Sequence, residues 1–154
     1  KCEVTAVLDA DTNGITTSGA NPDLRGNRVS HCDTGIYVVY GAEGVVKDNV
    51  IEGCSGSGLR LGGVSHDLTL ERNSVVGCGS PLAAGFLVDG AAQILVDNRA
   101  ERCGGDGFTV LSAGCVLRGN KALDNLRDGF DIDVQASDTL LEQNVAKANA
   151  GEGI

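Results

Sequence analysis

The chain has 154 residues, of which 23 are Gly and only five are aromatic: three Phe and two Tyr, without Trp. Its net charge of −9 at pH 7 argues against nucleic acid and anionic membrane as partners. No apolar run approaches the ~20 residues that a membrane-spanning helix needs. Hydrophobic residues nevertheless make up 42% of the chain, so a core must be built from small aliphatic side chains in layered, repetitive packing.

Six asparagines divide the chain into repeats, with spacings of 22, 24, 25, 22 and 24 residues. A period in this range predicts a solenoid. Other residue types keep the same phase: Leu or Val three residues before each asparagine, a small aliphatic two after, Cys or Asn five after, and then Gly followed by Ile, Leu or Phe. The period-marking asparagines are Asn27, Asn49, Asn73, Asn98, Asn120 and Asn144.

Each repeat contains three short segments, and the segment that starts at the glycine alternates apolar and polar residues, as in residues 129–133. Alternation over so few residues indicates β-strands, and no stretch keeps a helical apolar stripe for three turns. The main alternative fold for this repeat pattern is a leucine-rich repeat. It lacks support because no Leu column lies five residues before the asparagines.

From about residue 14 to residue 154, the pattern resembles right-handed parallel β-helix proteins, the pectate-lyase-like group with its carbohydrate-associated β-helix repeats. We therefore predict an all-β right-handed parallel β-helix solenoid of about six coils of 22–25 residues, with three short strands per coil. A single domain is expected over residues 1–154, with a degenerate N-terminal coil (1–26) and regular coils (27–154). The chain stops where a strand begins, so we expect it to be part of a longer protein.

Successive coils of a parallel solenoid lie ~4.8 Å apart, which places equivalent side chains over one another. Phe86, Phe108 and Phe130 should then stack inside. The asparagines should point inward at a bend and bond the backbone of neighbouring coils, and Asn also tolerates the left-handed conformation. The glycines should permit a sharp turn into the third strand.

Four of the six cysteines, Cys32, Cys54, Cys78 and Cys103, share one repeat position. We interpret them as an internal ladder of free thiols, with disulfides or a metal site as alternatives. Cys2 and Cys115 lie outside this ladder and receive no assignment.

Two columns of the third strand should face outward. Residues two after each glycine are Thr16, Tyr37, Arg60, Leu87, Thr109 and Asp131, and those four after are Ser18, Val39, Gly62, Asp89, Leu111 and Asp133. Parallel β-helix enzymes carry polysaccharide grooves on this surface, so the resemblance implies substrate binding there. The candidate binding residues are Tyr37, Arg60, Asp89, Thr109 and Asp131. A solvated strand surface without function is the alternative.

Within that group the pattern is nearest to alginate C5-epimerase modules. Residues 120–130 are similar to the family's N-x-A-x-x-N-x-x-x-G-F strands, and residues 85–89 and 129–133 match its G-F-x-x-Asp form. The family's Asp-Pro-His motif is absent because neither proline precedes a histidine. Whether the chain is an enzyme stays open. The resemblance implies lyase or C5-epimerase chemistry at a uronate, with candidate catalytic residues Tyr37, Arg60, Asp89, Asp131 and Asp133. On neighbouring coils, Tyr37 is the candidate base and Arg60 the neutraliser of the substrate carboxylate.

Acidic residues lie one before the glycine in three consecutive coils, and two more follow on the adjacent strand. Stacked like charges repel by ~1 kcal/mol per pair. A bound Ca2+ would offset this repulsion, whereas acids that splay into water would need no ion. The candidate calcium ligands are Asp106, Asp128, Asp131, Asp133 and Glu152.

A further column, four residues before the asparagines, should also point outward: Asp23, Val45, Thr69, Ile94, Val116 and Leu140. Four of its members are apolar, which suggests a partner or self-association unless a local bend turns the column inward. Open coil ends offer a second route to self-association.

Our leading functional hypothesis is an extracytoplasmic or secreted module that binds a polysaccharide, and in its stronger form also processes it. Because the chain is acidic, a polyanionic glycan would require bridging cations, and a neutral glycan is equally admissible. The alternative is a non-catalytic structural or self-assembling β-solenoid.

Overall fold

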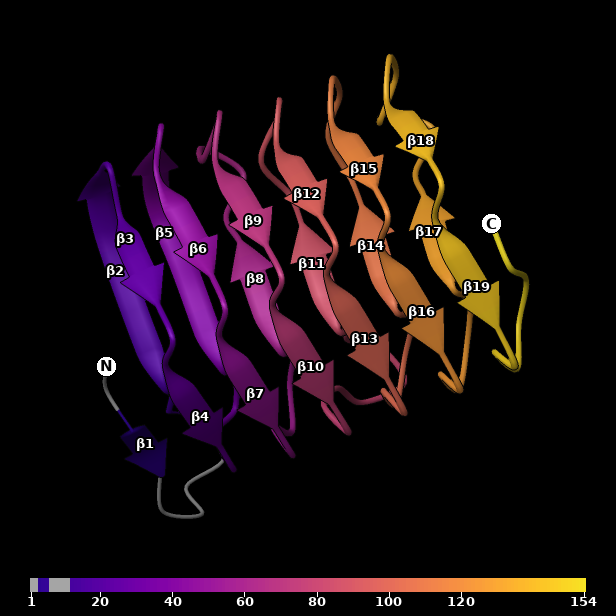
Figure 1. Cartoon of the computed structure of the whole chain (residues 1–154), viewed down its shortest axis with the longest axis horizontal. Helices are drawn as coiled ribbons and strands as arrows, with labels where there is room; N and C mark the ends of the chain where they lie inside the picture. The colour runs from indigo at the N-terminus through magenta and orange to yellow at the C-terminus, as the bar shows by residue number, and fades with distance from the viewer. Residues whose placement is uncertain (1–2, 6–11) are drawn as a thin grey trace.

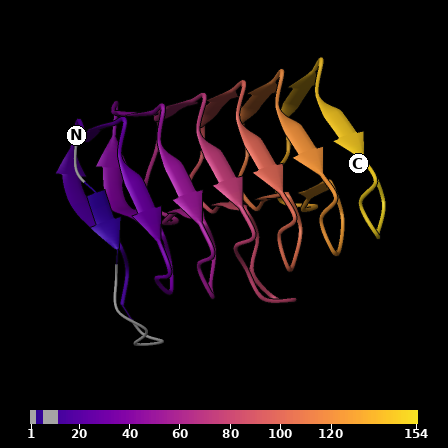
Figure 2. The ribbon, with the colours of Figure 1, turned by 60° about the horizontal axis from the view of Figure 1, so that its bottom comes forward.

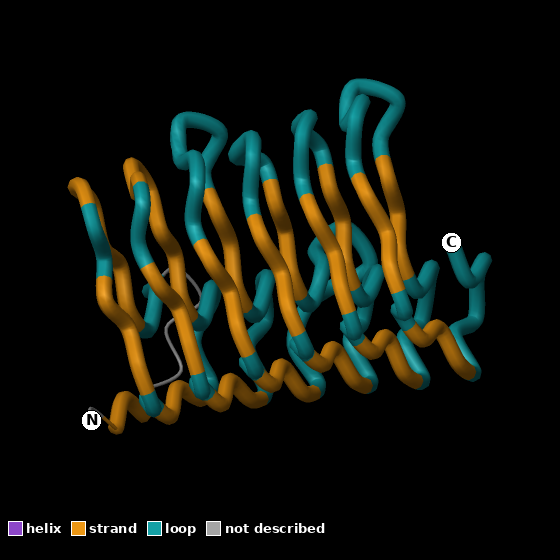
Figure 3. The backbone as a smooth tube through the Cα atoms, turned by 45° about the horizontal axis from the view of Figure 1, so that its top comes forward, coloured by secondary structure: helices purple, strands orange, loops and turns teal. Residues whose placement is uncertain are grey.

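The computed structural model describes residues 3–5 and 12–154, and over these residues the chain winds as a three-sided β-solenoid without helices (Figure 1). Every coil adds one strand to each of three parallel sheets, which run along the whole solenoid (Figures 2 and 3). The all-β expectation is therefore confirmed. The described residues contain no helix that is long and apolar enough to cross a membrane.

Over the described residues, the strands of each sheet follow one another in coil order. Sheet A contains β1 (Glu3–Thr5), β4 (Arg28–Ser30), β7 (Val50–Glu52), β10 (Ser74–Val76), β13 (Arg99–Glu101), β16 (Lys121–Leu123) and β19 (Val145–Lys147). Sheet B contains β2 (Ile15–Ala20), β5 (Ile36–Ala42), β8 (Leu59–Leu61), β11 (Phe86–Val88), β14 (Phe108–Val110) and β17 (Phe130–Ile132). Sheet C contains β3 (Asp23–Arg25), β6 (Val45–Lys47), β9 (Thr69–Glu71), β12 (Ile94–Val96), β15 (Val116–Arg118) and β18 (Leu140–Glu142).

The register places equivalent residues of successive coils side by side, so the core consists of columns. In sheet B, Phe108 lies between Phe86 and Phe130. The ring centroids are 4.7 and 4.9 Å apart and the rings are nearly parallel, at 7° and 8°. The predicted aromatic stack is confirmed. Leu95 of sheet C and Ala100 of sheet A, both fully buried, belong to the other two walls of the same core.

The asparagine ladder occupies the bend between sheets C and A. Asn73 is representative: its Oδ1 accepts hydrogen bonds from the backbone N–H and Nδ2 of Asn49, and its own Nδ2 donates to the carbonyl of Val46. The inward ladder is thus confirmed. The left-handed residue at this bend is the one before the asparagine, such as Arg72 (φ 50°) or Asp97 (φ 54°), so the ladder does not use the tolerance of Asn for that conformation.

The cysteine ladder is also internal. Cys54, Cys78 and Cys103 are buried and carry free thiols, and the backbone N–H of Cys54 donates to Cys78 Sγ. Asn125 continues the ladder because its Oδ1 accepts a hydrogen bond from the backbone N–H of Cys103. Cys115 is likewise buried and free, and its thiol donates to the carbonyl of Ser112. Cys2 lies outside the described residues.

The glycine before each sheet B strand, such as Gly107 or Gly129, is needed for a different reason from the one expected. None of the glycines in this column takes a positive φ. The turn instead passes so close to the next coil that a Cβ on Gly107 would lie 2.7 Å from the carbonyl oxygen of Gly129 and 2.8 Å from Asn125 Nδ2. Close approach between coils, not the sharpness of the turn, therefore requires glycine.

Candidate functional site

The outward surface of sheet B forms one continuous row of predicted site residues. Tyr37 of β5 pairs with Arg60 of β8, which pairs in turn with Leu87 of β11. Thr109 of β14 and Asp131 of β17 extend the row in register, although Thr109 is only 9% exposed, so its predicted outward exposure is wrong. Parallel pairing without a register shift between β5 and β17 places these side chains on neighbouring strands along the solenoid axis. The pairing in register agrees with the sequence pattern. That these residues form a binding site stays a prediction.

Tyr37 and Arg60 contact each other directly. The Arg60 Cζ lies 5.0 Å from the centroid of the Tyr37 ring, a cation–π distance. Arg60 is half-buried, and its Nε is buried without a hydrogen-bond partner among the described residues. The aromatic ring therefore holds a planar cation in place on the surface of the sheet, which preorganises its donors.

Two adjacent glycines, Gly62 and Gly63, lie beside this pair. A Cβ on Gly63 would lie 3.2 Å from Asp89 Oδ2, so this glycine makes room for the carboxylate, whereas a Cβ on Gly62 would be tight against the backbone carbonyl oxygen of Val39, at 2.9 Å. Asp89 itself follows β11, and its carbonyl accepts a hydrogen bond from Ser112 Oγ. The Gly-Gly pair was the available signal for this local space, and the sequence interpretation missed its role.

At the C-terminal end of the row, carboxylates bond the backbone of the next coil. Asp106 is 6% exposed. Its Oδ1 accepts a hydrogen bond from the backbone N–H of Asp128, and its Oδ2 accepts one from Thr109 Oγ1. Asp128 Oδ1 accepts from the backbone N–H of Glu152 in the same way. These acids therefore form a ladder between turns, and Asp106 and Asp128 do not simply splay into water.

Asp131 lies against this carboxylate ladder. Burial raises the pKa of Asp131, and the charges of Asp106, Asp128 and Asp133 raise it further, while Arg127 acts in the opposite direction. Within the described residues, no group of three or more His, Cys, Asp or Glu side chains is arranged to hold a metal ion. The calcium site stays a prediction.

A long turn over residues 79–84 folds across the neighbouring coil. The next coil has Gly104 and Gly105 beneath it, and a Cβ on Gly105 would overlap the Ala83 carbonyl. Arg127 belongs to the coil after that of Gly104 and Gly105. Its Nη1 donates a hydrogen bond to the carbonyl of Pro81, and its Nε lies 3.8 Å from Asp106 Oδ1. The sequence interpretation missed Arg127, because contacts across two coils belong to no repeated column.

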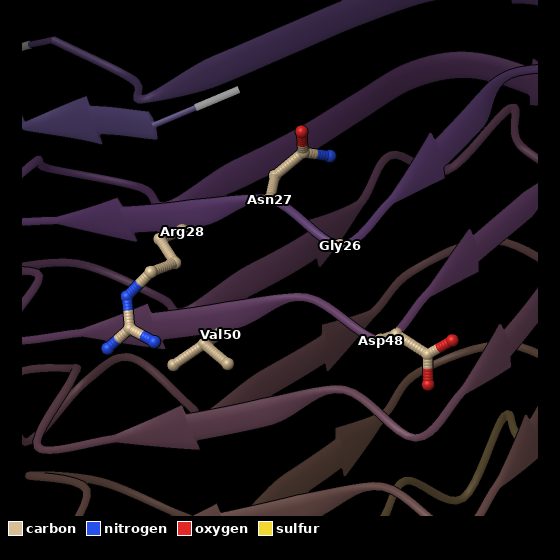
Figure 4. Close-up of a pocket in the computed structure, with 5 residues that line it drawn as sticks. All are labelled: Gly26, Asn27, Arg28, Asp48 and Val50. Carbon is tan, nitrogen blue, oxygen red and sulfur yellow. The ribbon is translucent and has the colours of Figure 1, made fainter. Parts of the chain in front are cut away.

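A hollow of about 380 Å³ lies at the bend between sheets C and A (Figure 4). Its walls are Gly26, Asn27, Arg28, Asp48 and Val50. None of these belongs to the predicted site, and the Asn27 side chain is already bonded to Asn49. The hollow therefore lies apart from the row on sheet B.

Three in-register parallel sheets, an asparagine ladder and stacked internal columns define the class of parallel β-solenoids. The chain belongs to the right-handed β-helix region family, whose model matches residues 1–115. No curated protein matches the chain. The nearer resemblance to alginate C5-epimerase modules stays a prediction.

Proposed function

We propose that the chain binds a polysaccharide outside the cytoplasm, along the outward surface of sheet B. One observation carries the proposal: Arg60 is held over the Tyr37 ring within a row that continues over five successive strands. A surface that runs straight along the solenoid suits a linear polymer as ligand. The sequence resemblance to carbohydrate-associated β-helix repeats points to the same ligand class.

The polar residues of the row and the neighbouring Asp89 have distinct roles in this proposal. Arg60 donates hydrogen bonds to sugar hydroxyls or to a uronate carboxylate. The carboxylates of Asp89 and Asp131 accept hydrogen bonds from sugar hydroxyls. Thr109 is 9% exposed and donates to Asp106 Oδ2, so in this proposal it positions Asp106 and does not itself contact the sugar. The buried Nε of Arg60 gains a partner if a ligand oxygen reaches it, which favours binding at this strand.

A catalytic form of the proposal uses the same residues. Epimerisation or lysis at a uronate C5 requires a base near the carbon and a cation near the carboxylate. Tyr37 would supply the base and Arg60 the cation, with Asp89, Asp131 and Asp133 as the remaining candidates. Polysaccharide binding does not depend on this stronger form.

The test begins with a glycan array that contains neutral and uronate-rich polysaccharides, probed with and without Ca2+. The best ligand is then titrated against wild type, Arg60→Met and Tyr37→Leu, with Arg28→Met on sheet A as a matched control for loss of an exposed arginine. We expect roughly tenfold weaker binding for each sheet B variant, equivalent to about 1.4 kcal/mol, and an unchanged affinity for the control. Absence of any ligand, or equal affinities for all four proteins, would refute the proposal.

A further inference from the structure

No described residue covers the outward surface of sheet C. This surface has two rows of side chains, and we call it the sheet C surface. Its first row is Asp23, Val45, Thr69, Ile94, Val116 and Leu140, and its second row is Arg25, Lys47, Glu71, Val96, Arg118 and Glu142. Ile94 is 42% and Leu140 45% exposed. The column expected to point outward does so, and no bend turns it inward.

The charges of the second row have a definite order. Lys47 Nζ lies 2.9 Å from Glu71 Oε2, and Arg118 Nε lies 2.7 Å from Glu142 Oε2. Val96 separates the two ion pairs, and the register places all five residues on consecutive strands. From β6 to β18 the row therefore reads positive, negative, neutral, positive, negative.

We propose that the sheet C surface binds the same surface of a second copy of this chain. The two-fold axis runs parallel to the strands and passes over β12. This rotation reverses the order of the coils but keeps each row opposite its own counterpart, and two sheets can stack with nearly aligned strands. Ile94 and Val96 then meet their own copies at the centre, where apolar contact excludes water.

The charges are complementary in this arrangement. Glu71 of one copy faces Arg118 of the second copy, and Lys47 faces Glu142 of the second copy. The Lys47–Glu71 pair of one copy therefore lies opposite the Glu142–Arg118 pair of the second copy. These four charges form one network, and the two-fold axis creates the same network on the other side of β12. In the first row, Val45 faces Leu140 and Thr69 faces Val116 of the second copy.

Neighbouring registers lack this match. An axis between β12 and β15 places Glu71 opposite Glu142, and an axis between β9 and β12 places Lys47 opposite Arg118. An axis over β9 or over β15 places Glu71 or Arg118 opposite its own copy. Like charges in opposition disfavour all four registers, so the charge order specifies one.

The two-fold axis along the solenoid is also disfavoured. It would place the first row opposite the second, so that Leu140 would face Glu142 and Val116 would face Arg118 of the second copy. Except for Asp23, which would face Arg25 of the second copy, the charged groups would then lose water without gaining a partner of opposite charge across the interface.

The size of the surface sets the expected strength of association. With the axis over β12, five strands of each copy overlap, from β6 to β18; at ~4.8 Å per strand they span about 19 Å, and three residues span about 10 Å. Such a surface is smaller than the ~800 Å² per partner of a standard interface. We therefore expect a concentration-dependent dimer with a dissociation constant on the order of 0.1 mM, which weakens as salt screens the ion pairs.

Sedimentation velocity over a protein concentration range from about 0.02 to 1 mM tests the proposal, because it brackets the expected constant. Wild type should change from monomer to dimer. Glu71→Lys, Arg118→Glu and Ile94→Glu should each remain monomeric, because each places like charges opposite one another. Lys121→Glu, a charge reversal at an exposed position on sheet A, should dimerise as wild type does, and melting curves report whether every variant is folded.

A mixture of the Glu71→Lys and Arg118→Glu variants distinguishes this interface from any other mode of association. In a mixed pair, the lysine introduced in one chain faces the glutamate introduced in the other, and the native Arg118 of the first chain faces the native Glu71 of the second. The mixture should therefore dimerise although neither variant does alone. A wild-type monomer at the highest concentration would overturn the proposal and leave the surface to a different partner. A dimer that persists in both single variants, or a mixture that stays monomeric, would overturn it equally.

Discussion

Asn98 donates hydrogen bonds from both its backbone N–H and its Nδ2 to one acceptor, the Oδ1 of Asn120 in the next coil, at 2.9 and 3.0 Å. The second hydrogen of Nδ2 goes to the carbonyl of Leu70, at 2.8 Å. Both asparagines are fully buried. The ladder therefore satisfies backbone groups at a bend where no strand partner is available, which is why polar side chains are tolerated inside the solenoid.

Asn98→Leu should lower the free energy of unfolding by ~1–3 kcal/mol, because it leaves buried donors and acceptors of two neighbouring coils without partners. Urea denaturation measures the loss. Lys121→Leu, at an exposed position of the following coil, should change stability by no more than ~0.5 kcal/mol. Equal stability of Asn98→Leu and wild type would contradict the structural role of the ladder.

Phe108 stacks on both Phe86 and Phe130, whereas each of these two rings has one stacking partner. Phe108→Leu should therefore cost more than Phe130→Leu, by about the ~0.5–1.5 kcal/mol of one additional aromatic pair. Leucine fits this position sterically, since Leu59 occupies the same column two coils earlier. Denaturation curves of the two variants give the comparison, and an equal cost would show that ring stacking adds nothing beyond burial.

The columns could be predicted from sequence because strand alternation has a period of two residues and because one repeat length brings like residues together. The cause of the glycine column could not. The distance between Gly107 and the Gly129 carbonyl depends on how closely two turns pack, which no single repeat encodes. The contact of Arg127 with Pro81 also escaped, since it joins residues of different repeat positions across two coils.

Gly85→Ala should be far more harmful than Gly77→Ala. A Cβ on Gly85 would lie 2.8 Å from the Gly107 carbonyl oxygen and 2.9 Å from Cys103 Sγ, while one on Gly77 would meet nothing within 4 Å. Gly77 has a φ of +61°, so its substitution carries only the ~1–2 kcal/mol of a left-handed residue. We expect a loss of about 3 kcal/mol or more for Gly85→Ala. Thermal melts of the two variants compare the losses of stability. A larger loss for Gly77→Ala would mean that neighbouring coils can move apart to accommodate a Cβ at position 85.

The cysteine ladder should resist thiol reagents. Burial raises the pKa of Cys103 to about 11 and also raises that of Cys115. The hydrogen bond shared with Cys78 lowers the pKa of Cys54 to about 7, yet Cys54 is only 3% exposed. In a Cys2→Ser background, native protein at pH 8 should react slowly with a disulfide reagent, because burial limits access to every ladder thiol and the raised pKa of Cys103 and Cys115 keeps their thiolate population low; at Cys54 burial alone provides the protection. All five remaining thiols should react at once in denaturant. Rapid reaction of native Cys54 would contradict the burial of the ladder.

Asp131 should destabilise the native protein at neutral pH. Its pKa is raised above the ordinary value by burial and then by Asp106 and Asp128, so the native state binds the proton more tightly than the unfolded chain. Stability from this group therefore falls as pH rises from the unfolded pKa of about 3.9 through the higher native pKa. Asp131→Asn should raise the Tm at pH 7 and lose that advantage below the unfolded pKa, whereas Asp124→Asn, at an exposed turn, should not.

The same two variants decide the calcium prediction. A cation held by Asp106, Asp128, Asp131, Asp133 and Glu152 would offset the repulsion that raises the pKa of Asp131. Added Ca2+ should then raise the Tm of wild type and of Asp124→Asn by several degrees and that of Asp131→Asn by less. Mg2+ at the same concentration controls for ionic strength, because it binds poorly to irregular oxygen cages. Melting curves that Ca2+ leaves unchanged would exclude the site, and the carboxylates would then serve only to bond the turns of successive coils.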